Sequence, residues 1–253
     1  MDVRLAAGPD GTAPPDTARR CFLQEVAALL ALGCIGTAEA QAPAACLLTP
    51  EATEGPFYLD DALMRADIRD GRPGQPLRLR LRVVEARRGC APVQGALVSV
   101  WHCDANGSYS GESVTNRQTR YLRGVQATGA DGVATFTTIY PGWYPSRAIH
   151  IHFKVLLAQS EVLTSQLYFD DALSRQVLGS HPAYRAHGVP TRPTTGDPIA
   201  GSRPSTVRVN HPGDTGGALE GEFTVGIARL NVAAVPHQRP RRGAKVSQPT
   251  PRG

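Results

Sequence analysis

The sharpest structural signal in the chain lies at residues 77–83, where leucine and arginine alternate strictly up to Val83. Successive side chains of a β-strand point to opposite faces of the sheet. The alternation therefore predicts a half-buried strand, with the leucines against a core and the arginines in water.

The rest of the chain continues the β pattern. Further candidate strands, each rich in Val, Thr, Leu or aromatic residues, are 95–103, 133–138, 148–156, 162–169, 205–210 and 222–231. Helix is indicated only over 61–67 and 170–178, about two turns each. Short strands at this spacing predict an all-β fold, a two-sheet β-sandwich of about seven to nine strands with long loops and little helix.

A net charge of +5 raises the question of nucleic-acid binding, but its distribution argues against it. Residues 236–253 carry five basic and no acidic groups, residues 1–42 carry a net −2, and residues 43–235 therefore carry only +2. Of the 27 basic residues only Lys154 and Lys245 are lysines, a bias more typical of genome composition than of a phosphate-binding surface. We therefore predict no nucleic-acid partner.

Both ends of the chain are predicted to lie outside the folded domain. Residues 1–42 contain Arg19-Arg20-Cys21-Phe22-Leu23, an apolar stretch and Ala38-Glu39-Ala40, a pattern typical of a twin-arginine export signal. It predicts a periplasmic or extracellular protein without stable membrane insertion, because the apolar stretch is too short to span a bilayer. An N-terminal amphipathic helix is the alternative. Residues 236–253 lack apolar periodicity and are predicted to be a disordered basic tail, which leaves 43–235 as one folded domain.

Removal of the signal would leave three cysteines, Cys46, Cys90 and Cys103. One disulfide is expected in an oxidising compartment, and Cys46 with Cys90 is the expected pair because both flank loops. Cys103 lies in an apolar strand pattern and is expected to be a buried thiol.

The clearest chemical feature is His150-Ile151-His152. Residues two apart in a strand point to the same face, so both imidazoles can reach one metal ion. Taken alone, the pair is equally typical of two surface histidines at a strand edge.

Two tyrosines upstream change this interpretation. Tyr144 lies in a stiff Pro-containing turn a few residues before the histidines, and Tyr109 lies in a Gly-containing loop after a predicted strand. Phenolate is a hard, strongly donating oxygen ligand, and together with imidazole it favours Fe(III) over Zn(II) or Cu(I). Two neutral imidazoles and two phenolates would leave a ferric ion with one net positive charge. A lone tyrosine, by contrast, is more often a core or surface aromatic.

Three separated motifs resemble one known family. They are Trp101-His102-x-Asp104-x-Asn106-Gly107-x-Tyr109, Thr138-Ile139-x-Pro141-Gly142-x-Tyr144-Pro145 and Arg147-Ala148-x-His150-Ile151-His152-Phe153. With them the chain resembles, over roughly residues 46–230, the intradiol ring-cleavage dioxygenases, the group that contains protocatechuate 3,4-dioxygenase and catechol 1,2-dioxygenase. The resemblance implies a catalytic β-sandwich over 43–235. It also implies a non-haem Fe(III) enzyme that opens catechol-type rings with O2 to cis,cis-muconate-type products.

The resemblance also implies roles for single residues. Carried over position by position, Tyr109 and His150 would be the equatorial ligands of the iron, and Tyr144 and His152 the axial ones. Tyr144 would leave the metal when catechol binds and act as an internal base. Arg147 would stabilise negative charge that develops on the ring. Its alternative reading is a solvated arginine at a strand end.

Two further segments match the family. Gln166 resembles the family's glutamine behind the metal ligands, although an ordinary polar strand residue also fits. Residues 53–58 resemble the family's Thr-x-Gly-Pro-Tyr segment at the substrate mouth. The residues expected to line the pocket are Thr53, Gly55, Pro56 and Phe57.

Departures from the family pattern narrow the expectation. Only Pro145 and Ser146 separate Tyr144 from Arg147, where protocatechuate dioxygenases have a longer insertion, so we expect a more open pocket mouth. The helical N-terminal dimerisation domain of catechol dioxygenases is not expected, and the shorter exported members match better. Their substrates would be catechols met outside the cytoplasm. The rival hypothesis is a secreted metal- or aromatic-binding β-sandwich carrier without turnover.

Overall fold

The computed structural model describes residues 46–228 except 62, 159, 191 and 211–216. The predicted export signal at 1–42 and basic tail at 236–253 lie outside these residues. Within the described part, no helix has the length and apolarity needed to cross a membrane.

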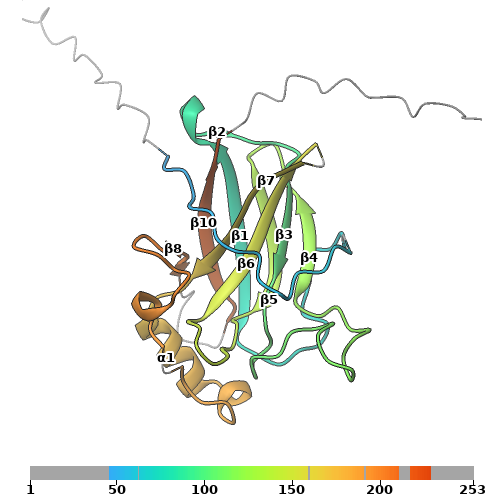
Figure 1. The fold of residues 1–253 in the computed structure, drawn as a ribbon, viewed down its shortest axis with the longest axis vertical. Coiled ribbons are helices and arrows are strands. Elements are labelled where there is room, and N and C mark those ends of the chain that lie inside the picture. Colours follow the sequence, from blue (N-terminus) through green and yellow to red (C-terminus); the bar gives the residue numbers. More distant parts are fainter. Residues whose placement is uncertain (1–45, 62, 159, 191, 211–216, 229–253) are drawn as a thin grey trace, which may run out of the picture. The chain divides into compact units, whose positions relative to one another are not determined.

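Two five-stranded sheets form the two layers of a sandwich (Figure 1). One sheet contains β1 (Pro76–Glu85), β2 (Ala91–Pro92), β5 (Val133–Ile139), β9 (Arg208–Asn210) and β10 (Leu219–Ile227). The other has the order β4 (Arg123–Ala127), β3 (Leu97–Trp101), β6 (His150–Leu157), β7 (Ser160–Tyr168) and β8 (Ser205–Thr206). The helical elements described are α1 (Asp171–Ser180) and 3-10 turns at Ala86–Arg88, Pro182–Tyr184 and Thr194–Gly196. The predicted all-β sandwich with little helix is confirmed, and two of its strands are only two residues long.

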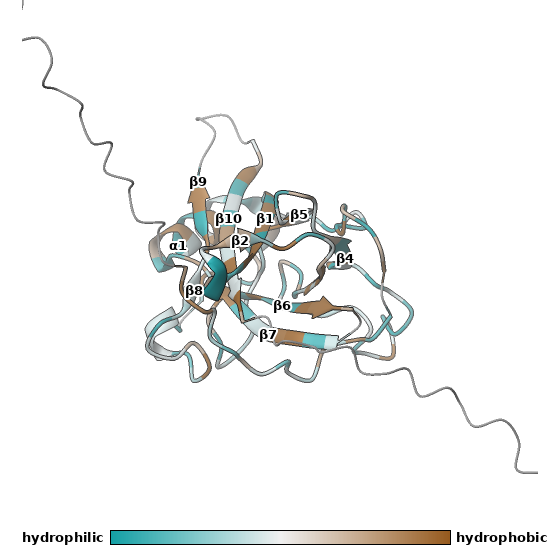
Figure 2. Cartoon of the chain, turned by 90° about the horizontal axis from the view of Figure 1, so that it is seen from above, coloured by the Kyte–Doolittle hydropathy of each residue, from teal (hydrophilic) through white to brown (hydrophobic). Residues whose placement is uncertain are grey.

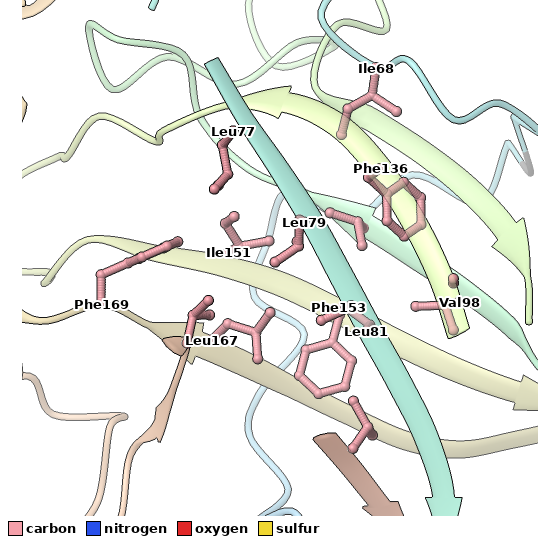
Figure 3. Packing of buried hydrophobic residues seen from close by; sticks show 14 of the residues in the cluster. Ile68, Leu77, Leu79, Leu81, Val98, Phe136, Ile151, Phe153, Leu167 and Phe169 are labelled. Carbon is pink, nitrogen blue, oxygen red and sulfur yellow. The ribbon is translucent and has the colours of Figure 1, made fainter. Parts of the chain in front are cut away.

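The alternation at residues 77–83 is realised in β1, the central strand of its sheet. Its leucines are at most 1% exposed and point between the layers, whereas Arg82 is exposed. Figure 3 shows these leucines close to apolar side chains of β6 and β7, namely Ile151, Phe153 and Leu167. Burying one such leucine contributes about 2 kcal/mol relative to exposing it. The end-on view of Figure 2 shows β1, β5, β9 and β10 in one layer and β6 and β7 in the other.

The helix predicted over 61–67 is wrong. Its described residues form isolated bridges instead, Met64 with Val125 of β4 and Asp67 with Thr137 of β5. An isolated two-turn helix is unstable because nucleation costs more than a few hydrogen bonds return. The strands offer backbone partners instead, and the segment pairs with them.

The other expected elements hold with shifted ends. The helix predicted over 170–178 is α1, which Asp170 caps by accepting a hydrogen bond from the Leu173 amide at 2.8 Å. The run 205–210 divides into β8 and β9. The sequence patterns missed β4, because Arg123 and Gly124 interrupt its apolar character.

Cys46 and Cys90 form the predicted disulfide. It ties the start of the described chain to the turn after β1. Cys103 is a free and buried cysteine, as expected, and burial raises the pKa of its thiol.

Candidate functional site

The candidate site lies on the outer face of one sheet, beneath two loops. In β6, Ile151 and Phe153 point into the core between the layers. His150 and His152 therefore point to the opposite face, yet they are only 2% and 1% exposed. Gly55 of the 49–58 segment and Tyr109 of the loop between β3 and β4 lie against His152, and Tyr144 of the loop between β5 and β6 lies against His150. The imidazoles therefore lie in a buried compartment.

A tight turn brings Tyr144 and Arg147 together. The Arg147 amide donates to the Tyr144 carbonyl at 3.3 Å, with Pro145 and Ser146 between them. Ser146 has a φ of 73°, the left-handed value that the third residue of a type II turn adopts, and such a turn accommodates proline as its second residue. The turn places Arg147 Nη1 within 3.3 Å of Tyr144 Oη.

The loop that carries Tyr109 is fixed by its own backbone and by the Tyr144 loop. The Asp104 carboxylate accepts hydrogen bonds from two backbone amides of the loop, both at 3.0 Å. Gly107 has a φ of 81°, and a Cβ there would lie 2.1 Å from the Trp143 carbonyl oxygen. The Gly142 amide donates to the Asp104 carbonyl at 3.2 Å. The loops bearing the two tyrosines are thus in direct backbone contact.

All four predicted metal ligands come together. His150 Nε2 lies 3.0 Å from Tyr144 Oη and 3.1 Å from His152 Nε2. The Tyr109 ring completes the group, with its centroid 5.9 Å from that of Tyr144 and 6.2 Å from that of His152. The pair of surface histidines considered as an alternative is therefore not what the fold contains.

The hydrogen bonds around His150 leave one ring nitrogen free to serve as a ligand. Its Nδ1 lies 2.7 Å from the Ala148 carbonyl oxygen. Because a carbonyl only accepts, Nδ1 carries the hydrogen, and the Nε2 lone pair points toward Tyr144 and His152. Tyr109 Oη is buried, and no described residue makes a hydrogen bond of normal geometry with it. This oxygen is therefore available as a metal ligand.

These donor atoms fit a ferric ion. Metal–ligand bonds of about 2.1 Å at right angles place neighbouring donors about 3.0 Å apart, close to the spacings seen here. Two imidazoles and two phenols are borderline and hard donors that suit iron. Across the described residues, no cluster of three or more His, Cys, Asp and Glu offers a competing metal site.

Burial sets the protonation of the site. It lowers the pKa of His150 to about 4 and that of His152 well below its usual value, so both imidazoles are neutral at ordinary pH and free to act as ligands. Burial also raises the pKa of Tyr109 and Tyr144, although the Arg147 charge opposes this effect. The phenolate forms that would bind iron therefore require the charge of the cation itself.

We expect the metal-free protein to lose stability as pH falls from about 6.5 toward 4. Over this range histidines of the unfolded chain bind protons, whereas His102 and His150, whose pKa burial lowers to about 4, stay neutral when folded. Protonation therefore favours the unfolded state, by up to roughly 3 kcal/mol per histidine.

Urea unfolding of the metal-free protein at pH 7 and pH 4.5 would measure this effect. A His102→Asn variant is the matched control, since it should lose one histidine's share of the pH dependence. An unfolding free energy that stays constant between the two pH values would contradict the expectation.

Arg147 is not a solvated strand-end arginine, since its side chain is only 11% exposed. Its Nη1 lies 3.3 Å from Tyr144 Oη and 3.4 Å from His150 Nε2, and its Nη2 donates to Gln166 Oε1. Its Nε donates to Asp197 Oδ2 at 2.9 Å. The guanidinium is therefore held directly against the ligand cluster.

Gln166 links this cluster to the segment at the predicted pocket mouth. It is 1% exposed, and its Oε1 also accepts a hydrogen bond from the Tyr168 hydroxyl at 3.0 Å. Its Nε2 donates to the Thr53 carbonyl at 2.9 Å. An ordinary exposed strand residue would make neither contact.

Two of the predicted pocket residues touch the ligand cluster directly. Phe57 stacks on Tyr109, with ring centroids 4.4 Å apart, and meets Tyr144 edge-on at 6.1 Å. A Cβ on Gly55 would lie 3.3 Å from His152 Cε1, and its φ of 73° also favours glycine. The Thr53 hydroxyl accepts a hydrogen bond from the Gly55 amide at 3.2 Å. Pro56, in the same turn, is exposed.

Several residues that support the site were assigned no role from the sequence. Trp101 stacks almost parallel on His152, at 5.1 Å and 11°. Lys154 of β6 pairs with Glu54 and holds the 49–58 segment against the sheet. Asp197 lies 50 residues beyond Arg147 in a turn-rich segment, where no periodic pattern could mark it.

The fold and the site together define a β-sandwich protein with a buried cluster of two tyrosines and two histidines. A family model described as dioxygenase matches residues 52–176. The intradiol ring-cleavage dioxygenase from Tetranychus urticae is 29% identical with a TM-score of 0.66, over 74% of this chain and 98% of that one. The dioxygenase domain of a carbohydrate-binding fusion protein from Streptomyces sp. SirexAA-E is 31% identical with a TM-score of 0.52, over 72% and 99%. The chain belongs to the intradiol ring-cleavage dioxygenase family.

The chain matches its curated relatives over only about half of their length. Catechol 1,2-dioxygenase 1 of Acinetobacter lwoffii is 32% identical over 142 residues, which are 47% of this chain and 45% of the relative. A chlorocatechol 1,2-dioxygenase of Burkholderia cepacia is 31% identical over 140 residues, 47% and 54% of the two chains. The chain thus spans about half the length of these relatives.

Proposed function

We propose that this protein is an Fe(III)-dependent intradiol dioxygenase that opens a catechol-type ring with O2 to a cis,cis-muconate-type product. The observation that carries the proposal is the position of His150 Nε2, which lies 3.0 Å from Tyr144 Oη and 3.1 Å from His152 Nε2, beside Tyr109. The names of the curated relatives, which act on catechol and chlorocatechol, support the substrate class.

Tyr109, Tyr144, His150 and His152 would hold the iron. Bound Fe(III) would supply Lewis acidity toward the catechol oxygens and would make the ring reactive toward O2.

Tyr144 is suited to move a proton. Burial raises the pKa of Tyr144, so its phenolate oxygen would be a strong proton acceptor. Once this oxygen is no longer bound to the metal, it could take the proton of a catechol hydroxyl. Arg147 Nη1, 3.3 Å away, can donate a hydrogen bond to the same oxygen and hold it in place. Tyr144 would thus serve as the base that prepares the substrate.

Arg147 and Phe57 would act on the bound ring. The guanidinium is buried against the cluster and carries a fixed positive charge where negative charge develops during ring opening. Phe57, stacked on Tyr109, offers an aromatic face and excludes water from the donor atoms. The turn between Tyr144 and Arg147 contains only Pro145 and Ser146, and both are exposed. No long insertion therefore covers the cluster at this turn.

We further propose that the protein is exported, as its twin-arginine pattern suggests. The Cys46–Cys90 disulfide supports this proposal, because structural disulfides persist mainly in oxidising compartments. Fractionation of cells that make the full chain would test it, and protein found only in the cytoplasm would contradict it.

Oxygen uptake by the iron-loaded protein tests the proposed function. With a panel of substituted catechols, we expect consumption of one O2 per catechol and formation of a ring-opened dicarboxylate. Binding of catechol without O2 uptake would instead favour a carrier without turnover.

A further inference from the structure

Asp197 is a buried carboxylate directly behind Arg147. Its side chain is fully buried, and it lies in the loop that follows the 3-10 turn Thr194–Gly196. Its Oδ2 accepts hydrogen bonds from Arg147 Nε at 2.9 Å and from the Ala148 amide at 2.7 Å. Among the described residues, the ion pair of this carboxylate is with Arg147.

The loop itself fixes the carboxylate. Asp197 Oδ1 accepts from the backbone amides of Ile199 at 2.8 Å and Ala200 at 3.2 Å. Because four donors converge on its two oxygens, this side chain has little freedom to rotate. It is a rigid anchor rather than a flexible surface partner.

The three guanidinium nitrogens of Arg147 contact different partners, Asp197 on one side and the cluster of Tyr109, Tyr144, His150 and His152 on the other. Nε faces Asp197, Nη1 faces Tyr144 and His150, and Nη2 faces Gln166. A guanidinium is planar, so fixing Nε sets the direction of both Nη atoms. The arginine side chain is otherwise long and rich in rotamers.

We propose that Asp197 is a positioning residue that orients Arg147 toward Tyr144 and the reacting ring, an inference that rests on the proposed function. The hydrogen bonds of Asp197 go to Arg147 and to backbone amides, not to the four donor side chains, so it would act through Arg147. Loss of its charge would leave the buried guanidinium without its ionic partner and free to turn from the cluster.

The test compares Asp197→Asn with Asp171→Asn. The control removes a charge that anchors the same loop, since Asp171 accepts from the Thr194 amide and hydroxyl, but it does not contact Arg147. We expect Asp197→Asn to lower kcat about ten- to a hundredfold, with smaller changes in KM and unchanged iron content. The control should stay within about twofold of the unaltered protein.

A second comparison separates positioning from general support of the fold. In an Arg147→Ala background, Asp197→Asn should lower kcat by less than about twofold further, because two residues that act as one unit are not additive. A full ten- to hundredfold loss in that background would overturn the proposal, as would an unchanged kcat in the single variant.

A measurement on the metal-free full chain does not depend on activity. The Arg147 Nε–H signal in 15N NMR, assigned by its loss in Arg147→Lys, should exchange slowly with solvent in the unaltered protein and in Asp171→Asn. In Asp197→Asn it should exchange at least about tenfold faster. Equally slow exchange would overturn the positioning role, whereas a protein that opens no catechol ring would refute the proposed function instead.

Discussion

Replacement of Tyr144 by Phe is expected to abolish ring opening, with kcat at least about a thousandfold lower. The change removes one proposed oxygen ligand and the proposed proton acceptor while keeping the ring that packs against Phe57. His152→Ala should have an effect of the same size, because it removes a nitrogen 3.1 Å from His150 Nε2. Oxygen uptake with catechol under saturating iron would measure both.

Tyr121→Phe is the matched control for these variants. Tyr121 is a buried tyrosine whose hydroxyl meets Asn116 at 3.5 Å, in a core cluster separate from the four donors. We expect its activity to stay within about twofold of the unaltered protein. Full activity in Tyr144→Phe or His152→Ala would refute the ligand assignment.

Loss of the Cys46–Cys90 disulfide is expected to destabilise the folded protein by about 4 kcal/mol. The bond joins residues 44 apart, and a loop of this length loses about that much free energy of closure in the unfolded chain. Denaturant unfolding of a Cys46→Ser/Cys90→Ser variant would measure the change.

Reduction of the unaltered protein provides the internal control. It should lower the unfolding free energy by the same amount, whereas a reductant should not affect the double variant. A difference below about 1 kcal/mol between variant and oxidised protein would contradict the entropic account.

The same bond is expected to matter for the site. Cys46 begins the described segment that leads to Thr53 and Phe57, and this segment is held to the sheet by hydrogen bonds such as that from the Ala52 amide to the Thr164 carbonyl at 2.9 Å. Freeing one end of the segment loosens the cover over the donor cluster.

The parts of the fold that were predictable from sequence are those with a local cause. The leucine–arginine alternation predicted β1 because side-chain direction in a strand depends only on neighbouring residues. The same period placed His150 and His152 on one face. Residues 61–67 were misjudged because bridges to Val125 and Thr137, far along the chain, decide their conformation.

The site divides in the same way. The four donors were predictable through motifs that resemble a family, and the structure brings them together. The contact between Asp197 and Arg147 was not, because it joins two loops 50 residues apart, and loops carry no period from which a partner can be deduced. Likewise, nothing in the run around Gly107 indicates how closely it meets the Trp143 carbonyl.

The visible spectrum and metal content of the purified full chain test the central claim most directly. We predict about one iron per chain and a phenolate-to-Fe(III) absorption band that weakens in Tyr109→Phe and changes when catechol is added. A colourless protein that holds zinc and consumes no O2 with catechol would contradict the claim.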